Sequence, residues 1–446
     1  MGTQSTYLMD IVQEMIDTGL SITQYRIKVH IYTGSEWVTP LTVQNYYLYR
    51  DYEGSFADTE MLTVQMGLGD YAYGIFPNRD QLLIEVTSEA QVTNADAYHQ
   101  SEPVTAKRYR GVLLTQTNPA MSASGGDVST KEDLNQQGII SVEFQLLDEA
   151  NYQVRMATVG RNYRNVTPME VLVSALTENR TAVVANSQQL IRGVDVVPGY
   201  NETKRSQLCI RPTRLTDLVA VLQDKEGGLY SAGAGCYLQD GMWFIYPLYN
   251  MNLIGNYTRT LTIVMLPPRL YQGEHTYMVS GDSVTIICNG SASTIDQGLA
   301  QQIDHSNGYR FINANNLMTA TTTDNNATTL DRSKNLYEFS GGAFSDSANN
   351  LQWGDRRATS NPFPYYTELA RRSTRPIRLK WNYADPSLLT PGMPVRIVTA
   401  SEGKIVSKQG TLLHVETNRT TIDDGPIKEH FSSNVTLGIN IKREGI

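Results

Sequence analysis

Short runs of alternating apolar and polar residues, separated by turn-forming residues, recur along most of this chain and constrain its fold more than any other feature. Near the start, Tyr25, Ile27, Val29 and Ile31 alternate with polar or charged residues. Side chains of a strand point alternately to its two faces, so this spacing predicts a half-buried strand. Short strands at such intervals favour an antiparallel barrel or sandwich. Further strands are expected at residues 41–49, 60–66, 82–87, 108–114, 139–147, 152–158, 377–381, 395–400, 410–417 and 436–442, with a hairpin turn at 146–151.

Three segments have helical spacing instead. Residues 7–18 place apolar side chains three and four positions apart, as in an amphipathic helix. Thr167 opens a capping box that Glu170 completes three residues later, with proline at the first helical position. Residues 215–223 repeat the apolar spacing and precede a glycine pair. Two more strands, at 229–236 and 241–249, make this part of the chain a mixture of helix and strand.

These patterns predict a β-rich α+β fold, with two antiparallel β-barrel or sandwich domains and a mixed α/β segment between them. Residues 1–160 are expected to form an N-terminal helix and the first β-barrel, and residues 161–270 the mixed segment. Residues 271–375 are irregular and resemble an insertion, with a Thr- and Asn-rich stretch at 319–329. Residues 376–446 are expected to supply C-terminal strands that complete a second barrel.

Charge and composition exclude several classes of protein. The 446 residues carry a formal net charge of −8. A dedicated nucleic-acid binder needs a basic surface, so no specific nucleic-acid partner is expected. No apolar run is long enough for a transmembrane helix, and the N-terminus has neither the basic nor the apolar part of a secretory signal. We therefore expect no membrane partner and no secretion. The 26 tyrosines against 9 phenylalanines suit β-structure and protein–protein contact.

Glycine and cysteine motifs give weak indications of chemistry. Gly233 and Gly235 form half of a dinucleotide-binding fingerprint, but no capped helix follows, so a turn before a strand is the favoured interpretation. Cys236 or Cys288 could pair in space with His275 as a nucleophile. Cys288, however, follows an apolar run in which a buried, inert thiol is far commoner. Cys209 is the third cysteine, and three cysteines give no disulfide framework.

Acidic and histidine residues form no catalytic or metal-binding pattern. No two of the six histidines lie within five residues of each other, which excludes a helical two-histidine zinc motif. The pairs Asp423–Asp424 and Glu132–Asp133 lie in turn-like contexts, where solvated loop carboxylates are the usual case. A calcium loop at Asp324 lacks its central glycine. The sequence therefore predicts no catalytic residue, no metal ligand, no cofactor and no enzymatic activity.

One basic cluster lies near the start of the C-terminal strands, close to aromatic residues. Such a cluster can contact nucleic acid, but the polar face of a strand with local ion pairs is favoured because the chain is acidic overall. Contact with an acidic neighbouring subunit is a third interpretation. The basic residues are Arg371, Arg372, Arg375, Arg378 and Lys380, and the aromatic residues are Tyr365, Tyr366 and Trp381.

Four segments together resemble the baseplate central hub proteins of contractile-tailed bacteriophages and related contractile injection systems. The first is YLYRDYEGSFAD at 47–58, followed by strands that end in IFPNRDQLLIEV at 75–86. The second is VEFQLL at 142–147 with QVRM at 153–156, leading to the capped helix. The third combines 212–223 with GLYSAG at 228–233 and WFIYP at 243–247, and the fourth is DPSLLTPGMPVR at 385–396. The pattern covers about two thirds of the chain and leaves 270–375 unmatched.

The resemblance implies a structural virion protein rather than an enzyme. It implies a homotrimer in which each subunit contributes two similar barrels, so that six barrels match a six-fold tail tube and three subunits match a three-fold central spike. The implied partners are the spike protein, tail-tube or tube-initiator proteins and other baseplate wedge proteins. The implied location is the tail baseplate of the virion, after synthesis in the host cytoplasm.

Two other functions stay open on the sequence. A tail-associated cell-wall hydrolase or glycan-binding adhesin is motivated by residues 270–375, where Glu274 and Asp304 are the acids to alter. A DNA-facing head–tail connector is motivated by the basic cluster and would bind duplex DNA with a steep salt dependence.

Overall fold

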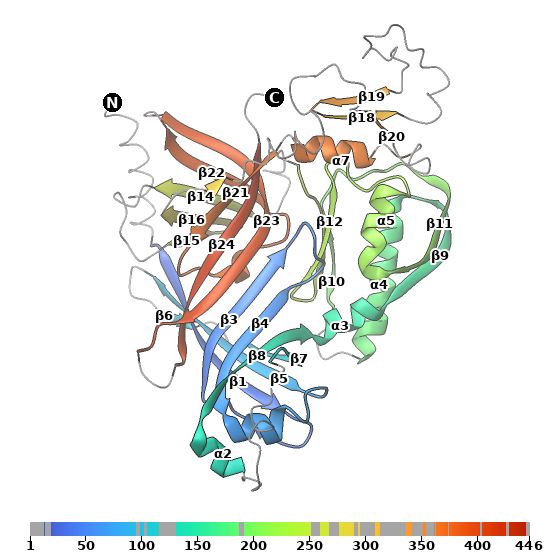
Figure 1. Cartoon of the computed structure of the whole chain (residues 1–446). Helices are drawn as coiled ribbons and strands as arrows, with labels where there is room; N and C mark the ends of the chain where they lie inside the picture. Colours follow the sequence, from blue (N-terminus) through green and yellow to red (C-terminus); the bar gives the residue numbers. More distant parts are fainter. Residues whose placement is uncertain are drawn as a thin grey trace.

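The alternating runs form strands that belong to one large sheet (Figure 1). In β1 (Ser21–Tyr32), Tyr25, Ile27, Val29 and Ile31 are buried, and the side chains between them are partly or fully exposed, as the pattern predicts. The structure is a computed structural model that describes residues 13, 19–94, 99–101, 105–115, 131–186, 191–250, 259–266, 276–289, 293–294, 308–312, 336–340, 351–353, 361, 363–372, 374–401, 404–424 and 428–442. The expected helix at 7–18 lies outside the described residues except for Gln13, as does the stretch at 319–329.

Eleven of the described strands pair side by side into a closed ring, which removes free edges from most of the sheet. The ring runs from β1 through β5, β7, β8, β4, β3, β23, β22, β14, β16 and β15 back to β1. The bounds of the other ten strands are β3 (Thr42–Asp51), β4 (Thr59–Gly67), β5 (Leu83–Asn94), β7 (Thr105–Leu113), β8 (Ile139–Asp148), β14 (Thr260–Leu266), β15 (Tyr277–Ser280), β16 (Ser283–Asn289), β22 (Pro394–Ser401) and β23 (Lys404–Thr421).

A further strand, β24 (His430–Lys442), crosses this ring and divides it into two closed circuits. It pairs with β1 near Phe431 and with β23 over most of its length. The first circuit is β1, β5, β7, β8, β4, β3, β23 and β24, and the second is β24, β1, β15, β16, β14, β22 and β23. Figure 1 shows β23 and β24 running from the upper strands down to the blue N-terminal strands. Strands β23 and β24, together with β1, therefore belong to both circuits.

Each circuit encloses its own apolar core. The first core includes Ile27, Leu62 and Phe144, and the second includes Trp381, Val395 and Leu437. The shared strand β24 contributes Phe431 to the first core and Leu437 to the second. Packing in one core is thus connected through a continuous strand to packing in the other.

A mixed α/β unit with a third core lies beside the strand ring (Figure 1). Its central sheet has β13 between β10 and β12, and a two-stranded ribbon of β9 and β11 lies beside its helices. The expected helices at 167 and at 215–223 are both present. The bounds are α3 (Glu149–Met156), β9 (Thr158–Val166), α4 (Pro168–Asn186), β10 (Gly193–Val196), β11 (Arg205–Arg214), η3 (Leu215–Asp217), α5 (Leu218–Asp224), β12 (Ala234–Gln239) and β13 (Met242–Pro247).

Shorter elements complete the described part of the chain. Strand β21 (Thr374–Trp381) is not one of the eleven ring strands; it pairs with the second half of β24, and its Leu379 and Trp381 belong to the second core. The remaining elements are β2 (Trp37–Val38), η1 (Asp70–Ile75), β6 (His99–Ser101), α2 (Lys131–Gln137), β17 (Ser293–Thr294), β18 (Gly308–Ile312), β19 (Leu336–Ser340), β20 (Leu351–Trp353), α7 (Phe363–Arg372) and η6 (Pro386–Leu388).

The strand expected at 152–158 and the hairpin turn expected at 146–151 are both wrong. Residues Glu149–Met156 form helix α3. The Asp148 carboxylate accepts a hydrogen bond from the backbone N–H of Ala150 at 2.6 Å and so caps the helix. Ala150 and Val154, four residues apart, are both buried. Residues two apart lie on different faces of a helix, so the four-residue spacing of Ala150 and Val154, and not an alternation, marks the buried face.

The expectation of a wholly antiparallel sheet is wrong at β14, which runs parallel to both β16 and β22. A parallel pair requires a long connection between its strands. The chain meets this requirement because β14 and β22 are separated by more than a hundred residues. Leu261 and Ile263 of β14 are completely buried, as expected for a central strand with covered faces.

The capping box at the start of α4 leads to a stability prediction. The Glu170 side chain accepts from the backbone N–H of Thr167 at 2.8 Å, and the Thr167 hydroxyl accepts from the backbone N–H of Glu170 at 3.1 Å. Replacing Thr167 with alanine should lower the free energy of unfolding by about 1 kcal/mol. Urea denaturation measures this change, and Thr177→Ala, at an exposed position of the same helix, is the control. Equal losses in the two variants would show that the cap adds nothing.

Candidate functional site

The glycines and cysteines singled out in the sequence have structural roles. Gly233 has a φ of +78° and lies just before β12, and Gly235 lies within β12 where a Cβ atom would be 2.4 Å from the Tyr246 ring. The turn-and-strand interpretation of this motif is confirmed. Burial raises the pKa of both Cys236 and Cys288 to about 12, so both remain protonated thiols at neutral pH. Cys209 is exposed on β11, and His275 lies outside the described residues.

Of the acidic candidates, only Asp423 and Asp424 have side chains that the structure describes. The Asp423 carboxylate accepts hydrogen bonds from the backbone N–H groups of Glu429 and His430, each at 2.8 Å, which closes the turn between β23 and β24 and lowers its pKa. The neighbouring Asp424 is exposed. Within the part of the chain that the structure describes, no group of three or more His, Cys, Asp or Glu side chains could hold a metal ion. Asp324, Glu274 and Asp304 lie outside that part, and the side chains of Glu132 and Asp133 are not described.

The basic cluster is mainly the outward face of β21. Arg378 and Lys380 are exposed, whereas the intervening Leu379 is buried. Trp381 is completely buried, and its indole N–H donates to the Thr276 hydroxyl at 3.1 Å. The tryptophan therefore does not belong to a surface for stacking bases. Arg371 Nε lies 4.0 Å from the Glu53 carboxylate, and the side chains of Arg372 and Tyr365 are not described.

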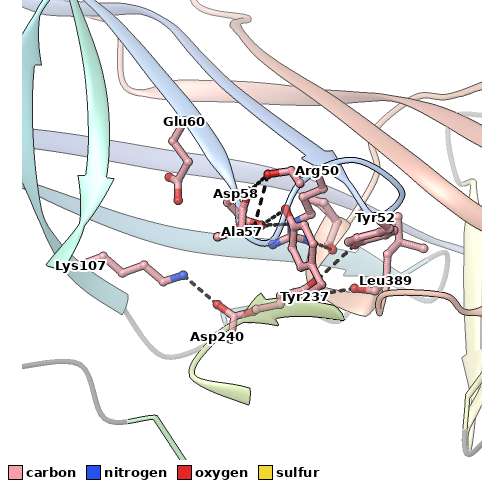
Figure 2. Close-up of polar contacts among 12 residues, drawn as sticks. Arg50, Tyr52, Ala57, Asp58, Glu60, Lys107, Tyr237, Asp240 and Leu389 are labelled. Atoms are coloured by element: carbon pink, nitrogen blue, oxygen red, sulfur yellow. Dashed lines mark hydrogen bonds and ion pairs between the residues drawn. The ribbon is translucent and has the colours of Figure 1, made fainter. Parts of the chain in front are cut away.

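The structure instead gathers a set of charged and tyrosine side chains that the sequence motifs did not identify. We call this set the polar junction, because it lies where the first circuit, the α/β unit and the loop before β22 meet (Figure 2). Its members are Arg50, Tyr52, Asp58 and Glu60 from β3, β4 and their connection, Lys107 from β7, Tyr237, Gln239 and Asp240 from β12 and the following turn, and Asp385 and Leu389 from the loop before β22.

The centre of the polar junction is a buried ion pair. Arg50 Nε lies 3.3 Å from the Asp58 carboxylate, and their side chains are 5% and 12% exposed. Two further contacts anchor the pair to distant segments. The Tyr237 hydroxyl donates to Asp58 at 2.8 Å, and an Arg50 N–H donates to the carbonyl of Pro386 at 2.9 Å. One ion pair thus connects β3, β12 and the loop before β22.

Tyr52 and Gln239 extend these connections. The Tyr52 hydroxyl donates to the Gln239 side-chain oxygen at 3.1 Å, and the Gln239 amide donates to the carbonyl of Leu389 at 2.9 Å. The Tyr246 hydroxyl donates to the Tyr52 carbonyl at 2.6 Å. Because these groups are buried, each lost partner would leave an unsatisfied polar atom. The arrangement fixes the relative positions of three parts of the chain.

A second, more exposed ion pair connects β7 to the turn after β12 at the edge of the polar junction. Lys107 Nζ lies 2.8 Å from Asp240, and the two side chains are 42% and 44% exposed. Solvent screening limits such a pair to about 1 kcal/mol or less. Burial favours the neutral forms of Lys107 and Asp240. Each group nevertheless stabilises the charged form of the other, so the pKa of Lys107 is raised and the pKa of Asp240 is lowered.

Glu60 is the buried acid of the polar junction. Burial raises its pKa above the ordinary value of 4.5, although nearby Lys107 opposes the shift. The Tyr46 hydroxyl donates a hydrogen bond to its carboxylate. Because the pKa of Glu60 is higher in the folded than in the unfolded state, its protonation contributes stability that is fully present below the unfolded-state pKa. This contribution is lost as the pH rises through the folded-state pKa.

Replacing Glu60 with glutamine should therefore make stability less dependent on pH. The stability of the variant relative to the natural protein should increase as pH rises above 4.5 and level off above the folded-state pKa of Glu60. Urea midpoints at several pH values measure the difference. Glu143→Gln, at an exposed position of β8, is the control and should change the profile far less. A constant difference between Glu60→Gln and the natural protein at all pH values would contradict the assignment.

A cavity of about 630 Å³ adjoins the polar junction. It is lined by residues of the first circuit, by the turn between β12 and β13, by the loop before β22 and by Arg419 of β23. Its lining combines tyrosine rings with four cationic and five acidic side chains. These are Tyr25, Tyr46, Tyr109, Arg50, Lys107, Arg192, Arg419, Asp58, Glu60, Asp148, Asp240 and Asp385.

Comparison with known proteins gives similarity to solved structures only. No protein-family model matches the sequence, and no curated protein matches it. Within the described ranges, no helix has the length and apolar character needed to cross a bilayer.

Several solved structures are similar to this chain at low identity. A chain of the Francisella PdpA–VgrG complex is similar over 96% of this chain, with 9% identity and a TM-score of 0.42. This chain spans 59% of the length of that chain. The 43 kDa tail protein of prophage MuSo2 from Shewanella oneidensis is similar over 93% of this chain and 98% of its own length, with 8% identity and a TM-score of 0.44.

A chain of the phage P2 baseplate, in its activated conformation with Ca, is similar over 95% of this chain and 100% of its own length, with 11% identity and a TM-score of 0.32. These neighbours include proteins of phage tails and baseplates.

Proposed function

We propose that this protein is a structural subunit of a phage tail baseplate, a central hub that assembles as a homotrimer. The observation that carries the proposal is the division of one strand ring by β24 into two closed circuits with separate cores. In the proposal each circuit is a barrel domain. A trimer then presents six barrels around an axis, which can match six-fold symmetry on one face and three-fold symmetry on the other.

The proposed partners follow from this symmetry. A tail tube or tube-initiator protein would bind the six-barrel face, a three-fold spike would bind the opposite face, and wedge proteins of the baseplate would surround the trimer. The proposed place of action is the virion. The proposed role is assembly, without catalysis.

The sequence segments that resemble baseplate hubs support the proposal by their position. Segment 47–58 contains Arg50, Tyr52 and Asp58 of the polar junction. Segment 243–247 contains Tyr246, whose hydroxyl bonds to Tyr52, and segment 385–396 contains Leu389, whose carbonyl bonds to Gln239. Segments that are far apart in the chain thus meet at one place, which fits a framework that has to hold its barrels in a fixed relation.

The domain limits expected from the sequence also enter the proposal. Residues 1–160 would supply most of the first barrel and 161–270 most of the α/β unit. Residues 376–446 would complete the second barrel together with β14, β15 and β16, and β23 and β24 would be shared. Residues 271–375 were expected to be an insertion; because β15 and β16 belong to the ring, only the rest of this range would be one.

Mass measurement followed by electron microscopy tests the proposal. Light scattering after size exclusion should give about 149 kDa, three times the chain mass of 49.7 kDa. Cryo-EM averages of the same sample should contain three copies of the chain with six barrels around the axis. A protein that remains monomeric at high concentration, and also in the presence of a candidate spike protein, would contradict the hub.

A further inference from the structure

The cavity beside the polar junction contains a guanidinium group for which the described residues supply no acceptor. Arg419 lines this cavity from β23. Its Nε is buried and has no hydrogen-bonding partner. Among the described residues, no carboxylate or carbonyl lies within hydrogen-bonding or ion-pair distance of the rest of the group. An arginine has five N–H donors, so this one is far from satisfied by the protein.

Two tyrosine rings hold this guanidinium in place. Its central carbon lies 3.9 Å from the centroid of the Tyr25 ring and 5.2 Å from that of Tyr46. Contacts of a cation with the ring faces fix its position while leaving the N–H groups at its edge available. A positioned guanidinium with a free edge binds carboxylate or phosphate oxygens through two parallel hydrogen bonds.

The other polar groups of the cavity already have partners. Arg50 pairs with Asp58, and Lys107 pairs with Asp240. The Tyr25 hydroxyl donates to Asp385 at 3.1 Å, and the Tyr46 hydroxyl donates to Glu60. Both rings that hold Arg419 are therefore also anchored by their hydroxyl groups, which bond to Asp385 and Glu60.

We propose that this cavity binds a small organic carboxylate, whose oxygens accept hydrogen bonds from Arg419. A volume of about 630 Å³ is suitable for such a ligand, since small-molecule sites span roughly 300–1,000 Å³. The acidic side chains of the lining, five against four cations, repel a phosphate with two negative charges more strongly than a carboxylate with one. They also favour a ligand whose remaining part is polar or cationic.

The ligand would contact segments that lie far apart in the sequence. The lining comes from β1, β3, β4, β5, β7, β8 and α3, from Arg192, from β12 and the turn after it, from the loop before β22 and from β23. A carboxylate bound to Arg419 would thus add to the contacts of the polar junction. A ligand that binds only the folded state raises the unfolding temperature, and the rise grows with the logarithm of its concentration once the site is filled.

NMR of arginine side chains tests the proposal on the full chain. The Nε–Hε signal of Arg419 is assigned by NOEs to the rings of Tyr25 and Tyr46 and by its absence in Arg419→Lys. Sodium acetate, added to about 100 mM to saturate a millimolar site, should shift this signal along a saturable curve. Sodium chloride at equal ionic strength should not, and inorganic phosphate should shift it less.

Thermal unfolding gives a second measurement. Acetate should raise the unfolding temperature of the natural protein and of Arg378→Lys, the control at an exposed arginine of β21. It should not raise that of Arg419→Lys or Arg419→Met. The proposal is overturned if the Arg419 signal does not saturate with acetate or if chloride reproduces the shift. It is also overturned if acetate raises the unfolding temperature of the Arg419 variants as much as that of the natural protein. A stronger response to phosphate than to acetate would overturn the choice of a carboxylate.

Discussion

Replacing Arg50 with methionine is expected to lower the free energy of unfolding by about 3–5 kcal/mol, because the Asp58 carboxylate would stay buried without its cation. Asp58 is only 12% exposed, so its carboxylate would lose its cation without gaining full hydration. The Pro386 carbonyl would also lose the N–H donor that lies 2.9 Å away. The loss should appear as a lower urea midpoint at neutral pH, with the slope of the transition unchanged.

Arg108→Ala is the matched control for this prediction. Arg108 Nε lies 2.7 Å from Glu85, closer than Arg50 is to Asp58, but its side chain is 55% exposed. An exposed pair contributes about 1 kcal/mol or less, so the shorter ion pair should matter less. The double variant Arg50→Met with Asp58→Asn should lose less free energy of unfolding than the two single variants together, because it removes the unpaired charge. Equal losses in Arg50→Met and Arg108→Ala would contradict the burial argument.

The sequence contained a signal for the polar junction that motif analysis does not use. In β3, Arg50 follows Leu48 by two residues and so lies on the same face of the strand, and both are buried. In β4, Glu60 and Leu62 likewise lie two residues apart on one face, and both are buried. A charged residue at an inward position of an alternating strand is costly unless it is paired. Two such residues on neighbouring strands therefore predict a buried polar network, although not its partners.

The partners could not be predicted, because they come from distant parts of the chain. Tyr237 is 179 positions from Asp58, and Pro386 is 336 positions from Arg50. Alternation predicts which side chains face inward, but it contains no information on which strands become neighbours. The same limit applies to the parallel pairing of β14 and to the sharing of β23 and β24. Helix α3 was missed for a local reason, since eight residues provide too few periods to distinguish the two spacings.

Replacing Trp381 with alanine is expected to cost about 3–5 kcal/mol, since it removes a large side chain from the second core. Trp381 is completely buried and packs edge-to-face on Tyr277, with ring centroids 5.6 Å apart. Trp381→Phe keeps most of this volume and should cost less. Trp37→Ala, at a tryptophan that is 53% exposed, is the control and should cost less than about 1 kcal/mol.

This variant also tests whether the two circuits unfold together. Trp381 lies on β21, which pairs with the second half of β24, whereas the first half of β24 carries Phe431 into the first core. Because β24 is one continuous strand, damage to the second core should loosen both halves. Amide hydrogen exchange in Trp381→Ala should therefore accelerate around Phe431 as well as around Leu437, and urea unfolding should stay a single transition. If exchange rises only around Leu437 and the first circuit keeps its protection, the circuits are independent units that β24 connects without coupling.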